Sequence, residues 1–176
     1  MISSEKLTTA AQQLDDAEET VCKMEKIKGP LPYDLIASRR LLIAPVNIDA
    51  DPDDYYYSST SLSFRKFAHE ETGLEFLTIP SKLLDQRSAD AFLPTIIFTL
   101  SHLSQNPEIA AVLIETATNF IKISLGSISK KDPVTEVKII ISNPEQESYK
   151  KLEYKGPVSG LKSLEALLDK ATKHES

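Results

Sequence analysis

The sequence has very little cysteine: Cys22 is the only thiol in 176 residues. A single thiol excludes a disulfide framework within the chain and a cysteine-based metal site, and it is typical of a reduced, intracellular setting. The opening stretch MISSEKLTTAAQQLDD also lacks a basic segment followed by an apolar one, which argues against a secretory signal. We therefore expect a cytoplasmic protein, long enough to form one domain without covalent staples.

Long apolar runs and an excess of basic residues are missing as well. The most apolar stretches, AFLPTIIFTL and IAAVLI, are too short to cross a bilayer and are flanked by Asp90, Glu108, Glu115 and Lys122. The formal net charge is −6, whereas sequence-independent binding of nucleic acid depends on neutralising phosphates with lysine and arginine. Both observations argue against a membrane span and against a nucleic-acid partner.

Signatures of catalysis are also lacking. His69, His102 and His174 have no neighbour at metal-ligand or general-base spacing, and Cys22 has no matched histidine that would make it a nucleophile. No serine stands in a GxSxG turn. The sequence therefore predicts no catalytic residue and no cofactor, although a site assembled from distant residues would leave no such signature.

An acidic stretch, DADPDD, carries Asp49, Asp51 and Asp53 at alternating positions, as the first ligands of an EF-hand calcium loop do. Such a loop needs glycine at its sixth position and glutamate at its twelfth, where this chain has Asp54 and Thr60. The stretch predicts a solvated, turn-forming loop. Weak binding of a metal by the three aspartates, as in a metal-assisted hydrolase, is the alternative.

Tyr55, Tyr56 and Tyr57 follow this acidic stretch directly. Tyrosine provides a large and fairly rigid contact area, so the three residues predict a surface that contacts a partner. A strand that packs one of the rings inward is an equally good interpretation of the same residues.

Residues 1–29 predict an N-terminal helical arm. Strong helix formers run from Ser3 to Lys28, and GPLP then ends the segment, because Gly29 suits a helix C-cap and proline cannot continue the helix. A heptad seam along this segment consists of Leu7, Ala10, Leu14, Ala17, Val21 and Met24. The seam is thin, so the arm needs a surface to lie on, and we expect it to bind a protein partner or a second copy.

Residues 30–176 predict a single α/β or α+β domain with a small sheet. A strand at 41–48, a helix in SLSFRKFAHEETG and a strand in LEFLTI give a β-α-β passage. Two central helices are expected next, at 89–103 with a kink at Pro94 and from Pro107 to about Gly126. The last part, 106–176, combines the second of these helices with a β-hairpin around NPEQE and a closing leucine-striped helix.

The turn GPVSGLKS before the closing helix invites comparison with a phosphate-binding loop. A Walker-type loop ends in Gly-Lys-Ser/Thr, whereas Leu161 separates Gly160 from Lys162 here, and Pro157 removes one amide donor. The turn therefore predicts a structural corner between a strand and a helix.

The succession NPEIAAVLIETATNFI, VKIIIS, KKLEYKG and GLKSLEALL, within residues 106–171, resembles the small C-terminal units of uncharacterised bacterial proteins. Some of these are similar to effector-associated components of conflict and phage-defence operons. The resemblance implies an adaptor or accessory role without catalytic residues. We therefore expect a protein-binding adaptor, with a metal-assisted hydrolase and a regulator or antitoxin that binds an effector as the alternatives.

Overall fold

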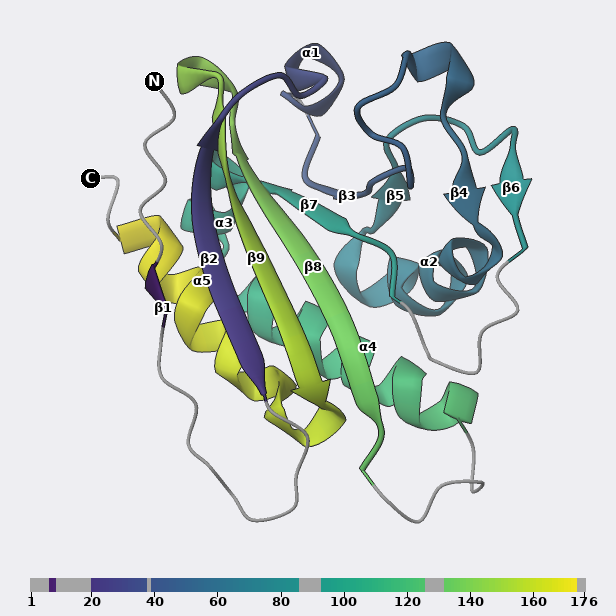
Figure 1. Ribbon diagram of the computed structural model, residues 1–176, viewed down its shortest axis with the longest axis vertical. Coiled ribbons are helices and arrows are strands. Elements are labelled where there is room, and N and C mark those ends of the chain that lie inside the picture. The colour runs from purple at the N-terminus through teal and green to yellow at the C-terminus, as the bar shows by residue number, and fades with distance from the viewer. Residues whose placement is uncertain (1–6, 9–19, 38, 86–92, 126–131, 174–176) are drawn as a thin grey trace.

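The computed structural model of the chain describes residues 7–8, 20–37, 39–85, 93–125 and 132–173 (Figure 1). Its centre is a mixed seven-stranded sheet with the strand order β1-β2-β9-β8-β7-β3-β5. Helices cover one face of this sheet, and a second, two-stranded parallel sheet lies at one end of the molecule (Figure 1). The predicted mixed α/β class is confirmed.

A long antiparallel hairpin forms the middle of the sheet. Strands β8 (Val134–Asn143) and β9 (Ser148–Pro157) pair along their whole length, and a 3-10 turn at Pro144–Gln146 joins them. Glu147 ends this turn with a φ of 47°, in the left-handed region that reverses the chain. The hairpin that the NPEQE stretch predicts is therefore confirmed.

The end of the predicted helical arm is a β-strand instead. Strand β2 (Val21–Lys28) pairs antiparallel with β9 from one end to the other, and β1 (Leu7–Thr8) pairs with its Lys23 and Met24. A strand places residues three apart on opposite faces, so Val21 and Met24 do not form a common seam. Pairing with β9 provides hydrogen-bond partners for the backbone of β2, and this tertiary contact outweighs the helix propensity of the residues. Ala10, Leu14 and Ala17 lie outside the described residues.

The predicted β-α-β passage is confirmed. Strand β3 (Leu41–Ile43) and strand β5 (Glu75–Phe76) are parallel neighbours, and helix α2 (Ser59–Thr72) connects them. Gly73 ends α2 with a φ of 71°, and its amide donates to the carbonyl of His69. Glycine adopts this left-handed conformation without the penalty that a Cβ would bring. A short helix, α1 (Tyr33–Ile36), precedes β3.

The first of the two predicted central helices is largely wrong. Strand β7 (Ile96–Thr99) lies between β3 and β8, and only α3 (Leu100–Gln105) is helical in the described part of this segment. Pro94 disfavours a continuous helix, and the β-branched residues that follow it favour a strand. All four β7 residues are buried, because the strand is covered on both faces, and such a strand is apolar throughout. The second central helix is confirmed as α4 (Glu108–Leu125).

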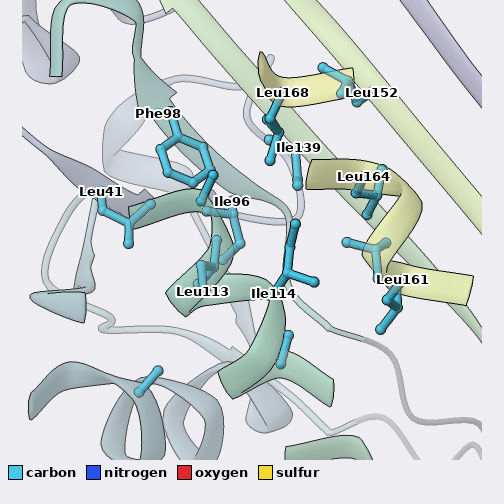
Figure 2. Close-up of a cluster of buried hydrophobic side chains, with 14 of the residues drawn as sticks. Leu41, Ile96, Phe98, Leu113, Ile114, Ile139, Leu152, Leu161, Leu164 and Leu168 are labelled. Carbon is cyan, nitrogen blue, oxygen red and sulfur yellow. The ribbon is translucent and has the colours of Figure 1, made fainter. Parts of the chain in front are cut away.

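Two apolar clusters hold the sheet. The larger one lies between the sheet and helices α2, α3, α4 and α5 (Ser163–Lys173), and Figure 2 shows part of it. Leu113 and Ile114 of α4 meet Ile139 of β8 there, beside Leu164 and Leu168 of α5. The smaller cluster, on the opposite face, consists of Ile36, Leu42, Ala44, Tyr55, Leu77, Ile97 and Ile140. Side chains from α1 and the chain after β3 thus cover only part of that face.

Candidate protein-binding surface

The acidic loop, residues 49–54, is a solvated turn with structural hydrogen bonds of its own. The Asp51 carboxylate accepts the amide hydrogen of Asp53 at 3.0 Å and so begins a 3-10 turn at Pro52–Asp54. Asn47 ties the loop together, because its amide group donates to the carbonyl of Asp54 at 3.1 Å and accepts from the Tyr56 amide at 3.0 Å. The predicted turn-forming loop is therefore confirmed.

Metal binding by this loop gains no support from its geometry. Asp49, Asp51, Asp53 and Asp54 are all exposed, and one oxygen of Asp51 already accepts a backbone hydrogen bond. Across the described residues, no group of three histidine, cysteine, aspartate or glutamate side chains is placed to hold a metal ion. The carboxylates act here as a patch of exposed negative charge.

Of the two interpretations of the three tyrosines, the structure favours the strand that packs a ring inward, because Tyr57 begins strand β4 (Tyr57–Ser58) and is buried. Tyr55 and Tyr57 are 3% and 0% exposed, and only Tyr56 reaches solvent in part. The Tyr57 hydroxyl accepts the amide hydrogen of Thr78 at 3.0 Å, and its ring lies edge-on to Phe76 at 4.9 Å. Tyr55 packs in the smaller apolar cluster and Tyr57 in the larger one, so burial of apolar area decides the position of both rings.

Four exposed apolar side chains lie on segments of the chain that adjoin the tyrosines. Val46, Ile79, Leu83 and Leu84 are 51%, 90%, 50% and 46% exposed, and we call these four residues the β6 surface. Leu83 and Leu84 form strand β6 (Leu83–Leu84), which pairs in parallel with β4 (Tyr57–Ser58). Single exposed apolar residues are ordinary on a protein surface, whereas groups of them mark contact sites.

Backbone hydrogen bonds place these residues on adjoining segments. The amide of Val46 donates to the carbonyl of Tyr56 at 2.9 Å, and the amide of Tyr57 donates to the carbonyl of Lys82 at 3.0 Å. Three extended segments therefore lie side by side, so Val46 and Leu83 are about two strand spacings, or roughly 10 Å, apart. β4 and β6 stand together at one side of the molecule, away from α5 (Figure 1).

Lys82 joins the β6 surface to the acidic loop. Its ammonium lies 3.3 Å from a carboxylate oxygen of Asp54 and donates to the carbonyl of Asp53 at 3.4 Å. These residues were not predicted from the sequence, because LTIPSKLLD has no hydrophobic periodicity beyond LTI. The one indication of an exposed apolar surface in the sequence is the pair of leucines after Pro80, which stand in a segment too short to bury both of them.

A second exposed region is the uncovered part of the sheet on β2, β9 and β8. Opposite charges alternate across it: Lys23 pairs in register with Glu153, and Glu25 with Lys151. The Lys151 ammonium lies 2.8 Å from Glu153, and this hydrogen bond lowers the pKa of the Glu153 carboxyl below its usual value. Charges that satisfy one another in this way are typical of a solvated face.

A cavity of about 230 Å³ lies beyond the end of β3, between the start of α2 and β8. Its polar lining is already paired: the Ser58 and Ser61 hydroxyls lie 2.8 Å apart, and Glu136 lies 3.3 Å from the Lys138 ammonium. Ligand pockets usually begin at roughly 300 Å³. This cavity is therefore a weaker candidate than the β6 surface.

His69, for which the sequence predicts no metal-ligand or catalytic role, belongs to a small cluster of polar side chains with Arg65 and Glu75. Its Nδ1 atom lies 3.1 Å from the Glu75 carboxylate and 3.0 Å from the carbonyl of Leu74. The Arg65 guanidinium donates to both oxygens of Glu75, at 3.0 and 3.1 Å. Through Glu75, these contacts connect α2 to β5.

Comparison of the chain with protein-family models, with curated proteins and with solved structures finds no match. In the part of the chain that the structure describes, no helix is both long and apolar enough to span a membrane. The assignment of function therefore depends on the surface of the molecule itself.

Proposed function

We propose that this protein is a binding subunit without catalytic activity of its own, and that a protein partner docks on the β6 surface. The observation that carries the proposal is the exposure of Ile79, Leu83 and Leu84, each nearly half exposed or more, on one short segment that includes β6. Such side chains gain free energy only when another surface covers them.

The expected gain is large enough to matter for affinity. Burying a leucine or isoleucine side chain completely is worth about 1.5–3 kcal/mol, so covering a half-exposed one contributes about 1 kcal/mol. Ile79, at 90% exposure, has nearly its whole side chain left to bury. A few such residues at the centre of an interface dominate binding energy, while the surrounding polar residues add specificity and speed of association.

The sequence predicted that a partner binds the heptad seam of the arm. Val21 and Met24 of that seam belong instead to strand β2 of the central sheet. The adaptor role in a defence or toxin-type system remains a prediction from the resemblance of residues 106–171. A regulator that binds an effector would use the same kind of surface. The hydrolase alternative has no arrangement of groups in its favour among the described residues.

Co-purification from the native host tests the proposal. The wild-type chain is expected to bring a partner in stoichiometric amount, and the double variant Leu83→Gln/Leu84→Gln is expected to lose it while melting near the wild type. The matched control is Leu62→Gln/Ile123→Gln, which replaces exposed apolar residues on α2 and α4 and is expected to keep the partner.

Two outcomes would contradict the proposal. One is a wild-type chain that brings no stoichiometric partner. The other is a partner that stays bound to a folded Leu83→Gln/Leu84→Gln variant.

A further inference from the structure

We propose that the partner's docking segment is an extended, positively charged peptide that adds a strand to the outer edge of β6. This inference rests on the proposed function and specifies the chemistry of the partner. It follows from the exposed edge of β6 and from the charge beside it.

The outer edge of β6 is open in the described part of the molecule. β6 is the last strand of its two-stranded sheet, and only β4 pairs with it there. Every residue from Ser81 to Asp85 is exposed. An extended peptide that pairs with such an edge gains main-chain hydrogen bonds, and its alternating side chains provide specificity.

β6 also lacks the protection that the structure gives to β2. Strands near the edge of a sheet are commonly guarded by lysines, and β2 carries Lys23, Lys26 and Lys28 as exposed residues. β6 has Leu83 and Leu84 in their place, and the neighbouring Lys82 is held by Asp54. An edge strand with apolar side chains and without free lysines is suited to pairing with another strand.

Charge complementarity selects a basic peptide. The acidic loop next to β6 carries four exposed aspartates, and Lys82 forms an ion pair with one of them, Asp54. The patch therefore remains negative, and it attracts lysine or arginine over about one Debye length, roughly 8–10 Å. A second copy of this chain would bring two acidic loops together, so like charges disfavour self-pairing through β6.

The two leucines define what the peptide must contain. Successive residues of a strand point to opposite faces, so Leu83 and Leu84 lie on different faces of β6. A peptide that packs against both leucines therefore needs two consecutive apolar residues, one for each face. A lysine or arginine at the end of the peptide beside Lys82 would then lie near the aspartates of the loop. The structure thus points to a short basic segment with an apolar pair at its centre.

Direct titration of the full chain with synthetic peptides tests the inference. The probe is a fluorescent octapeptide with two central valines flanked by lysines, and the matched peptide has glutamates in place of the lysines. Fluorescence anisotropy at low and at physiological salt measures the dissociation constant. We expect the lysine peptide to bind at least tenfold more tightly than the glutamate peptide, and to bind more weakly as salt rises.

Variants separate the contributions of charge and of the strand edge. Asp51→Asn/Asp53→Asn is expected to weaken binding of the lysine peptide severalfold, because asparagine can keep the turn but removes the charge. The control Glu70→Gln/Glu71→Gln removes two exposed charges from α2 and is expected to leave binding unchanged. N-methylation of alternate peptide amides is expected to abolish binding, since it removes the donors that pair with β6.

Failure of the inference and failure of the proposed function give different results. Equal binding of both peptides, or no binding of either, overturns the inference. The proposed function survives that result if the native partner is still lost in Leu83→Gln/Leu84→Gln. Dimerisation of the chain that depends on Leu83 and Leu84 would also overturn the inference, because a second copy would then be the occupant of the β6 edge.

Discussion

The hydroxyl of Tyr154 occupies the space where a side chain at Gly160 would begin. A Cβ atom at Gly160 would clash with this oxygen, which donates a hydrogen bond to the carbonyl of Pro157 at 2.5 Å. The ring is fully buried and cannot swing away. Packing against Tyr154 therefore requires the glycine in the GPVSG corner.

A double-mutant cycle tests this relationship. Gly160→Ala is expected to lower the free energy of unfolding by about 1–3 kcal/mol, the usual cost of overpacking. In Tyr154→Phe the nearest ring atom would lie 3.2 Å from the new Cβ, so this background is expected to relieve most of the clash. Urea unfolding of the four proteins measures the coupling, and strictly additive effects would contradict the assignment.

The same tyrosine predicts a loss of stability in alkaline solution. Burial raises the pKa of Tyr154 to about 12, above its ordinary value of 10. A raised pKa means that the folded protein holds the phenolic proton more tightly, so this stabilisation is complete below pH 10 and is lost as the pH rises from 10 to 12. In Tyr154→Phe, the free energy of unfolding is expected to fall less between pH 10 and 12 than it does in the wild type. Urea unfolding at stepwise pH measures this.

Phenolate absorbance at 295 nm gives an independent check. The wild-type chain is expected to show a late-titrating tyrosine that Tyr154→Phe lacks. If the two spectra titrate in parallel, the buried phenol is not the source of the alkaline loss.

Two adjacent lysines on β9 are expected to differ in their contribution to stability. The Lys150 ammonium is buried and donates to the carbonyl of Ala171 at 2.8 Å, near the end of α5, whereas Lys151 points to the open face. Lys150→Met is expected to cost about 1.5–3 kcal/mol, because it removes a charge-assisted bond to a helix end. The control Lys151→Met is expected to change stability by less than about 1 kcal/mol. Thermal melts that rank the two variants in the opposite order would refute this.

Removal of β2 is expected to unfold the protein. A chain that begins at Leu31 lacks the strand that pairs with β9 along its whole length, so the β9 backbone and part of the core would face solvent. A chain that begins at Thr20 keeps β2 and is the matched control. Circular dichroism should show a cooperative melt for the second chain only, whereas an independent helical arm would leave both chains folded.

The sequence predicted those elements whose signals are local. Gly73 ends a helix, Pro107 begins one, and NPEQE joins two strands, and each depends on the conformational preference of a few residues. The two errors have a common cause. Val21–Lys28 and Ile96–Thr99 are strands because distant strands pair with them, and no local pattern reports such a partner.

Of the candidate site, the sequence predicted the acidic loop but not the apolar residues of the β6 surface. Aspartates in a short stretch with proline must lie in a solvated turn, so the acidic loop could be placed from composition alone. The apolar residues could not be placed, because whether Leu83 is buried or exposed depends on what the rest of the fold brings against it. The same reason explains Tyr55 and Tyr57, which the fold buries in the two apolar clusters.

The pairing of β2 with β9 also has a consequence for synthesis of the chain. β2 leaves the ribosome early, but its partner strand is completed only at Pro157, after nearly all the other elements. Contacts between segments so far apart in sequence form slowly, and unpaired strands are prone to aggregate in the meantime. The lysines of β2 therefore also act during synthesis, because their charge opposes aggregation of the unpaired strand until β9 has been made.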